Sequence, residues 1–164
     1  MTEETIAEYT FEVSERLSRD YKYASSILAW LTENLESLTD DEDKKIFGKV
    51  NTGFNEETIK TFGKTPVCDI YINNSEFSSD FDEHKPQEVH TVLIFYVKGA
   101  NNPTYIKACE LYDYVMQQFI AEESFRMLED VVMDTYITDG EIQPRPIGKK
   151  WGVMGVLELS HILY

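Results

Sequence analysis

The residues that most often carry out chemistry are sparse in this chain and form no known catalytic pattern. The three histidines are His84, His90 and His161. No two of them are four residues apart, so the H-E-x-x-H zinc motif is missing. The chain also lacks G-x-S-x-G, G-x-G-x-x-G and G-x-x-x-x-G-K-[ST], which mark nucleophile elbows and nucleotide-binding loops. We therefore expect no catalytic residue, no cofactor and no metal, and a structural role for a histidine within a strand.

Acidic residues gather in three places where carboxylates could hold a cation or act as an acid–base pair. These are the TDDEDKK stretch at 39–45, the group Asp80, Asp82 and Glu83, and the group Asp134, Asp139 and Glu141. The 39–45 stretch lacks the glycine and the distal glutamate of a calcium-binding loop. Because acidic residues are abundant throughout the chain, chance neighbours are expected. We interpret the first two groups as exposed loops.

Charge and composition exclude several classes of protein. The chain has 164 residues and a formal net charge of -15, from 30 acidic and 15 basic residues. Such a charge repels phosphate backbones and argues against sequence-specific nucleic-acid binding. The densest basic cluster is only Lys149 and Lys150. Hydrophobic residues make up 42% and aromatic residues 13% of the chain, which favours one folded domain over residues 1–164.

The first residues and the cysteines indicate where the protein resides. The beginning, MTEETIAEYTFE, is acidic and lacks the apolar segment of a signal peptide. No apolar stretch approaches the roughly 18 residues of a membrane span, so we expect no membrane partner. Cys68 and Cys109 form no C-x-x-C pair, which favours two free thiols in a reducing compartment. We expect the protein in a cytoplasm, or in a particle assembled there.

The elements that must position these residues follow from the hydrophobic pattern. Residues 1–38 repeat apolar positions every three or four residues, which predicts a helical N-terminal segment with a break or bend between Arg19 and Lys22. The stretch 46–66 holds glycines and a proline and is expected to be mostly loop. Strands are predicted at 67–72 and 90–99, joined by a long polar and acidic loop at 73–88.

The second half is predicted to add a helix and two more strands. Asn102 is expected to cap a helix with Pro103 at its first position. Its Tyr112 and Tyr114 lie about 200° apart around the axis, so at least one must face outward. A third strand is expected at 131–137, with Asp139–Gly140 as a turn at its exit and 151–164 as the fourth strand.

This order predicts an α+β fold in one domain. The sheet, mixed or antiparallel, would have about four strands with helices mainly on one face, in the order α(α)-β-β-α-β-β, and residues 67–164 would form its sheet-and-helix core. In the last strand, Trp151, Val153, Gly155, Leu157, Leu159, His161 and Leu163 alternate with a more mixed set. We expect the Trp151 face to meet the helices and the other face to meet a neighbour or partial solvent.

The same layout resembles that of tail-terminator and neck proteins of long-tailed bacteriophages. The resembling parts are the helical start, the strand HTVLIFYVKG, the helix beginning NNPTYIKACELYDYV, and the closing pair VVMDTYI and WGVMGVLELSHILY. The resemblance implies a non-enzymatic virion protein, assembled in the bacterial cytoplasm. It implies a ring, usually sixfold, that ends the tail tube and docks the head connector or head-completion protein. An acidic lumen would let DNA pass, because it repels the backbone.

Six residues are candidate contacts within such an assembly: Phe77, Phe81, Arg145, Lys149, Met154 and Val156. The first two are apolar anchors in the acidic loop 73–88, the next two lie in the expected turn at 138–150, and the last two are on the mixed face of the last strand. A charge at Met154 or Val156 is expected to impair assembly more than folding. Two other functions fit the sequence: an acidic protein that mimics nucleic acid or binds a host factor, and a small enzyme with an unrecognised site.

Overall fold

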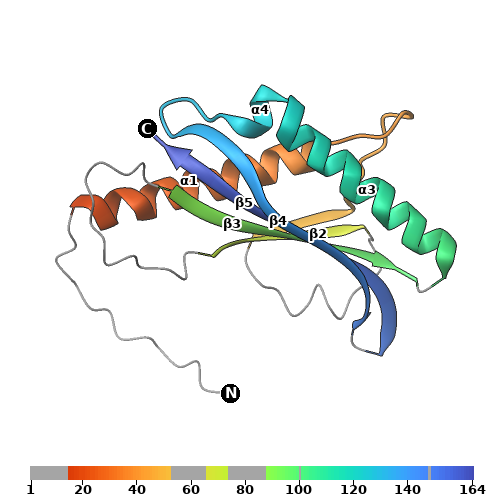
Figure 1. Ribbon diagram of the computed structural model, residues 1–164. Helices are drawn as coiled ribbons and strands as arrows, with labels where there is room; N and C mark the ends of the chain where they lie inside the picture. Colours follow the sequence, from red (N-terminus) through yellow and green to blue (C-terminus); the bar gives the residue numbers. More distant parts are fainter. Residues whose placement is uncertain (1–14, 53–65, 74–87, 100, 148) are drawn as a thin grey trace, which may run out of the picture.

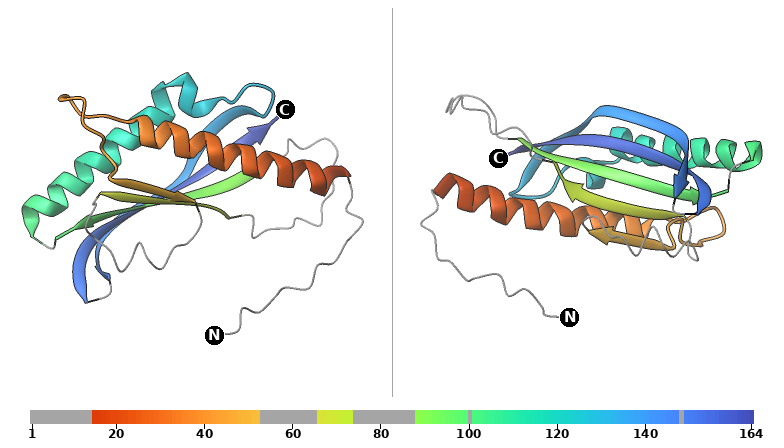
Figure 2. Two further views of the ribbon diagram at one scale, coloured as in Figure 1. Left: turned by 180° about the vertical axis from the view of Figure 1, so that it is seen from behind. Right: turned by 90° about the horizontal axis from the view of Figure 1, so that it is seen from below.

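The computed structural model describes residues 15–52, 66–73, 88–99, 101–147 and 149–164, and these form a mixed sheet with helices on one face (Figures 1 and 2). In chain order the elements are α1 (Glu15–Ser37), β1 (Lys49–Thr52), β2 (Val67–Ile72), β3 (Glu88–Lys98), α3 (Asn102–Ala121), α4 (Glu123–Arg126), β4 (Val132–Ile147) and β5 (Lys150–Leu163). The five strands lie in the order β1-β2-β3-β5-β4. This confirms the predicted α+β class.

The sheet has one strand more than expected. β1 lies within the 46–66 stretch that the sequence predicts as loop, and it pairs in parallel with β2 from Lys49 opposite Val67 to Thr52 opposite Ile70. The other neighbouring strands are antiparallel. β1 has only four residues, KVNT, and no continuous apolar pattern. It therefore forms a strand because it can pair with the edge of β2. Its own sequence carries too little information to predict it.

The first helix is continuous where a break was predicted. α1 runs from Glu15 to Ser37 through the region between Arg19 and Lys22. It contains no glycine or proline, the residues that usually interrupt a helix. Its buried residues Ile27, Leu31 and Leu35 follow a single stripe that faces the sheet. The first 14 residues of the predicted helical segment lie outside the described residues.

The N-terminus of α3 begins one residue earlier than predicted. Asn101, not Asn102, is the N-cap, and its side-chain oxygen accepts a hydrogen bond from the backbone N–H of Thr104 at 2.9 Å. Pro103 therefore occupies the second helical position. Two consecutive asparagines offer the same side chain, and proline is tolerated throughout the first turn, so the sequence alone does not separate the two possibilities.

The strand predicted to end at Ile137 continues for ten more residues. β4 extends to Ile147, and residues 138–147 are strand rather than the predicted turn. The pairing with β5 shifts between Ile137 and Asp139, which marks a β-bulge. The extra residue of this bulge is Thr138, whereas Asp139 and Gly140 pair regularly with Glu158 and Leu157 and form no reverse turn. β4 is an edge strand of the described sheet, and two of its residues, Pro144 and Pro146, have no N–H to offer another strand.

Tyr112 of α3 explains why the two long strands carry glycines. Its ring packs edge-on against Phe95 of β3, with ring centroids 6.3 Å apart, and its hydroxyl lies 3.4 Å from the carbonyl oxygen of Val156. A methyl group on Gly140 would overlap the Tyr112 hydroxyl oxygen, whereas one on Gly155 would press on ring carbons of Tyr112 and Phe95 at 3.1 and 3.2 Å. Both glycines therefore make room for one tyrosine.

Apolar clusters lie on both faces of the sheet. The main core joins buried residues of α1, α3 and α4 to alternating residues of the strands, among them Leu93, Leu157 and Leu159. This confirms that the Leu157 and Leu159 face of β5 meets the helices. On the opposite face Val92, Ile94 and Tyr96 are buried and form a second cluster. We infer that β3 is central in the sheet because both of its faces are covered.

The Tyr112 packing yields a test by a double-mutant cycle. Gly140→Ala should lower the free energy of unfolding by about 1–3 kcal/mol, because the methyl forces the tyrosine out of place. Adding Tyr112→Phe removes the overlapping oxygen, so the double variant should recover much of that loss in urea unfolding. Gly155→Ala is the matched control, since its contacts are ring carbons that Tyr112→Phe keeps. Equal coupling in both cycles, within about 0.5 kcal/mol, would contradict the packing described here.

Candidate interaction surfaces

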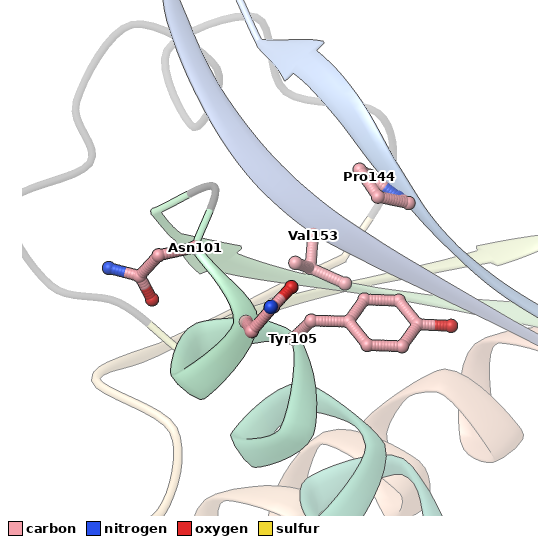
Figure 3. Close-up of a pocket in the computed structure, with 5 residues that line it drawn as sticks. Asn101, Tyr105, Pro144 and Val153 are labelled. Carbon is pink, nitrogen blue, oxygen red and sulfur yellow. The ribbon is translucent and has the colours of Figure 1, made fainter.

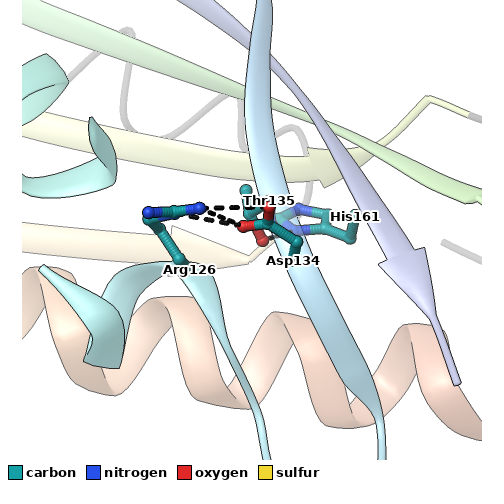
Figure 4. Close-up of polar contacts among 4 residues, drawn as sticks. All are labelled: Arg126, Asp134, Thr135 and His161. Atoms are coloured by element: carbon teal, nitrogen blue, oxygen red, sulfur yellow. Dashed lines mark hydrogen bonds and ion pairs between the residues drawn. The ribbon is translucent and has the colours of Figure 1, made fainter. Parts of the chain in front are cut away.

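A buried histidine joins three strands on the helix-covered face, and Figure 4 shows its contact with β4. His161 of β5 is fully buried, with its Nε2 2.7 Å from Oγ1 of Thr91 on β3 and its Nδ1 2.8 Å from Oγ1 of Thr135 on β4. The edge of Trp30 from α1 covers the ring at a centroid distance of 5.8 Å. Burial, with a smaller contribution from His90, lowers the pKa of His161 from 6.5 to about 3.

The neutral imidazole of His161 can satisfy both threonines, because it donates from one nitrogen and accepts at the other. No reactive group faces it within this set of contacts. We therefore conclude that His161 serves the structure by fixing the registers of β3, β5 and β4. We call the set Thr91, His161 and Thr135 the histidine clamp.

The segment beside the clamp is held by further polar contacts. The carbonyl oxygen of Ser124 on α4 accepts from Trp30 Nε1 at 2.9 Å and from Asn34 Nδ2 at 2.8 Å, which fastens α4 to α1. Arg126 of α4 donates two hydrogen bonds to the carboxylate of Asp134 on β4, at 3.0 and 3.1 Å (Figure 4). The helix α4, although only four residues long, is thereby anchored on both sides.

The same three strands are joined on the opposite face by Glu88 of β3. Its carboxylate accepts hydrogen bonds from Ser160 of β5 at 2.9 Å and Tyr136 of β4 at 3.1 Å. Nε2 of His90 lies 3.7 Å from the same carboxylate. An adjacent hollow of about 220 Å³ is lined by Asn73, His90, Thr91, Val92, Thr138, Glu158 and Leu159. The Glu88 carboxylate thus accepts from a hydroxyl of each of the two neighbouring strands, β5 and β4.

The acidic groups that the sequence singled out do not converge. Asp134 is engaged by Arg126, and the Asp139 carboxylate accepts from the backbone N–H of Gly140 at 2.8 Å. Glu141 is exposed farther along β4. Within the described part of the chain, no three His, Cys, Asp or Glu side chains are placed to hold a metal ion. Residues 80–83 lie outside the described residues.

A hollow of about 280 Å³ lies where α3 begins beside the β4–β5 hairpin (Figure 3). It is lined by Asn101, Asn102, Tyr105, Pro144 and Val153. Figure 3 shows the Tyr105 side chain extending from α3 alongside Val153. These five lining residues supply amides, a phenol and apolar carbons, but no carboxylate, imidazole or amine. Their chemistry is therefore that of a contact surface.

The predicted contact residues Arg145 and Lys149 are both exposed near the tip of the β4–β5 hairpin. Arg145 lies in β4, because the predicted loop proved to be strand, and Lys149 lies in the short connection to β5. The sequence had grouped these two correctly, although it placed them on a loop. Phe77 and Phe81 lie outside the described residues.

Met154 and Val156 lie together on the helix-free face of β5. Both are half-buried and pack against the cluster of Val92, Ile94 and Tyr96. A charge at either position would therefore lose packing within the fold as well as any contact with a neighbour. Variants at Met154 or Val156 therefore cannot separate a loss of assembly from a loss of folding, and residues with more exposed side chains are needed for that test.

The hairpin carries contact residues that the sequence did not reveal. Trp151 was predicted to meet the helices, but 56% of it is exposed, because β5 continues past the end of β3. Lys98 and Arg145 both pair with Gly152, one from each side. Directly paired residues project on the same face, so the two cations flank a position without a side chain. Only the register, which spans residues far apart in sequence, places them together.

Two comparisons with known proteins found no match for this chain. No protein-family model matches it, and no curated protein matches it with significance. Among the described helices, none combines the length and the apolar character needed to cross a lipid bilayer. Any functional proposal must therefore rest on the surfaces described above and on the resemblance in layout.

The histidine clamp predicts a stability that falls with pH below neutrality. In the unfolded chain His161 takes up a proton below its ordinary pKa of about 6.5, whereas in the folded protein it stays neutral down to about pH 3. Protons then favour unfolding across this interval, so stability is fully present above pH 6.5 and is lost as pH falls. His161 alone should lower the free energy of unfolding by about 2 kcal/mol between pH 7 and pH 5.

Urea unfolding of three proteins across pH 5–7 checks this dependence. His161→Gln, which keeps one donor and one acceptor, should be less stable at pH 7 but should show a flatter pH profile. His90→Gln, which changes a half-exposed histidine, should retain most of the wild-type slope. Parallel profiles for wild type and His161→Gln would show that the clamp is not the group responsible.

Proposed function

We propose that this chain is a structural subunit of the neck or tail end of a long-tailed bacteriophage. In this role it forms a ring that ends the tail tube and joins it to the head connector or head-completion protein. The proposal starts from the resemblance in layout, and the observed order of helices and strands is compatible with it. Among the described residues, His161 and Glu88 are each held by hydrogen bonds to neighbouring strands, which is compatible with structural roles for both.

The observation that carries the proposal is the β4–β5 hairpin. Among the described strands none pairs with the hairpin beyond Gly152, because β3 ends at Lys98 opposite that glycine; the backbone N–H of Gly99 donates one further hydrogen bond, to the carbonyl oxygen of Trp151 at 3.1 Å. It extends away from both long helices at one end of the sheet (Figure 1). At its outer end it presents Trp151, an aromatic residue of the kind enriched in protein interfaces. A projecting hairpin with an exposed tryptophan is well suited to bind another subunit.

The competing function, an acidic inhibitor or nucleic-acid mimic, draws on the net charge of -15. Such a protein acts as a monomer or dimer and uses its carboxylates as the contact surface. A ring subunit instead needs a contact that repeats between copies and closes on itself. Assembly state therefore separates the two functions.

Light scattering across concentration and salt, with electron micrographs of the same sample, tests the ring. We expect closed particles of uniform diameter and a mass roughly six times the 19.0 kDa of one chain. A chain that stays monomeric at millimolar concentration in low and high salt would contradict the proposal. In that case, binding to a basic host protein would support the inhibitor function.

A pair of exposed aromatic residues tests whether the hairpin makes the contact. Trp151→Ser should abolish particles while leaving the free energy of unfolding within about 0.5 kcal/mol, because the side chain is 56% exposed. Tyr114→Ser is the matched control, since Tyr114 is also an exposed aromatic residue (38%) and lies nine residues farther along α3 than Tyr105, which lines the hollow beside the hairpin. If both variants form particles equally well, the hairpin is not the subunit contact.

A further inference from the structure

The two ends of the β4–β5 pair carry opposite charge. Residues 142–157 contain Arg145, Lys149 and Lys150 and no acidic residue, in a chain whose net charge is -15. Lys98 adds a further exposed amine beside Gly152. The tip of the hairpin is thus a basic projection on an acidic protein, and we call it the basic tip.

The opposite end of the same strands is acidic and apolar. There the connection from α3 to β4 exposes four carboxylates, those of Glu122, Glu123, Glu129 and Asp130. Exposed apolar side chains lie in the same segment, with Met127 39% and Met133 46% exposed. The bridge between Leu128 and Val132 brings the residues beside it, Met127 and Met133, to neighbouring positions. We call this region the acidic end.

One chain cannot bring these two regions together. The pairing of β4 with β5 runs from Val132 opposite Leu163 at the acidic end to Ile147 opposite Lys150 at the tip. At about 3.3 Å per residue, the 14 residues of β5 separate the regions by roughly 45 Å. Figure 1 shows the hairpin and α4 at opposite ends of the molecule. Any contact between them must therefore join two molecules.

We propose that the basic tip binds the acidic end of a second copy of this chain. The partner is a second copy because the two regions complement each other in charge and in apolar groups. Two acidic bodies repel each other in most orientations, and the tip-to-end orientation places opposite charges together. The inference rests on the proposed ring, for which it supplies the contact between subunits.

The side chains of the tip suit carboxylates and thioethers. Lys98 and Arg145 flank Gly152 on one face of the hairpin at about two strand spacings, roughly 10 Å, so a partner carboxylate can enter between them. Trp151 lies on the alternate face, where it can pack on Met127 or Met133, since thioether sulfur packs well on aromatic rings. The basic tip can therefore contact the acidic end of a partner with both of its faces. Because the contact is heterologous, its repetition gives a ring or a filament.

Charge reversal in two separate variants tests this contact. The tip variant is Arg145→Glu with Lys149→Glu, and the end variant is Glu122→Lys with Glu129→Lys. Asp130 is left unchanged because its positive φ of 63° suits aspartate, and Glu122 makes no side-chain cap to α4. Sedimentation should show each variant alone to associate at least about tenfold more weakly than wild type. Mixed, they should form assemblies in which the two variants alternate in equal number, because the tip of each is complementary in charge to the end of the other.

Matched controls separate this contact from a general effect of charge. Lys44→Glu with Lys45→Glu changes the charge as much as the tip variant does, and Glu110→Lys with Asp113→Lys matches the end variant. All four of these residues are exposed and lie in neither region. Both controls should associate like wild type at 0.1 M salt. The chain that carries both the tip and the end reversals should recover self-association.

Three outcomes would overturn the inference. Particles that persist in both variants would leave the ring standing but place its contact elsewhere. Variants that fail to pair when mixed, although folded by circular dichroism, would remove the tip-to-end contact. A tip variant that loses binding to a 20-base-pair DNA duplex while retaining wild-type association would reassign the tip to nucleic acid. If wild type forms only dimers but the mixed variants still associate, the tip-to-end contact is supported and the proposed ring is contradicted.

Discussion

The histidine clamp is the constraint on which the rest of the sheet depends. A neutral imidazole between two threonine hydroxyls satisfies every polar atom that it buries, so it costs little as long as the strands keep their register. A one-residue slip of β3 or β4 would leave His161 without partners in the core and turn alternate residues to the wrong face. Glu88 adds a second connection across the same strands from the opposite side.

A register fixed in this way has consequences far from the clamp. It sets Gly140 and Gly155 beneath Tyr112, and it sets Lys98 and Arg145 on either side of Gly152. These positions are separated by tens of residues in sequence, yet each depends on the same alignment of three strands. The packing of α3 and the charge of the hairpin tip are therefore both determined by the pairing that His161 secures.

Much of the fold can be predicted from the sequence, because long apolar patterns report directly on burial. The strand around VLIFYV and the alternation of the last strand are of this kind, and the helix-facing side of β5 was predicted correctly apart from Trp151. What could not be predicted depends on partners distant in sequence. β1 exists because β2 offers an edge, and Gly140 lies in a strand rather than in a turn, where the Tyr112 hydroxyl takes up the space that a side chain would need. Arg145 and Lys149 could be named from charge, but Lys98 joined them only through register.

The two prolines of β4 have a consequence of a different kind. An exposed edge strand can pair with a strand of another molecule through backbone hydrogen bonds. Such pairing discriminates little between sequences, because every residue except proline offers the same amide and carbonyl. Pro144 and Pro146 withdraw two amides from the outer part of this edge. Recognition there falls to side chains, which differ between related proteins even when their folds do not. In the proposed assembly, two homologues made in one cell would then remain separate populations, because their contact side chains differ while their backbones do not.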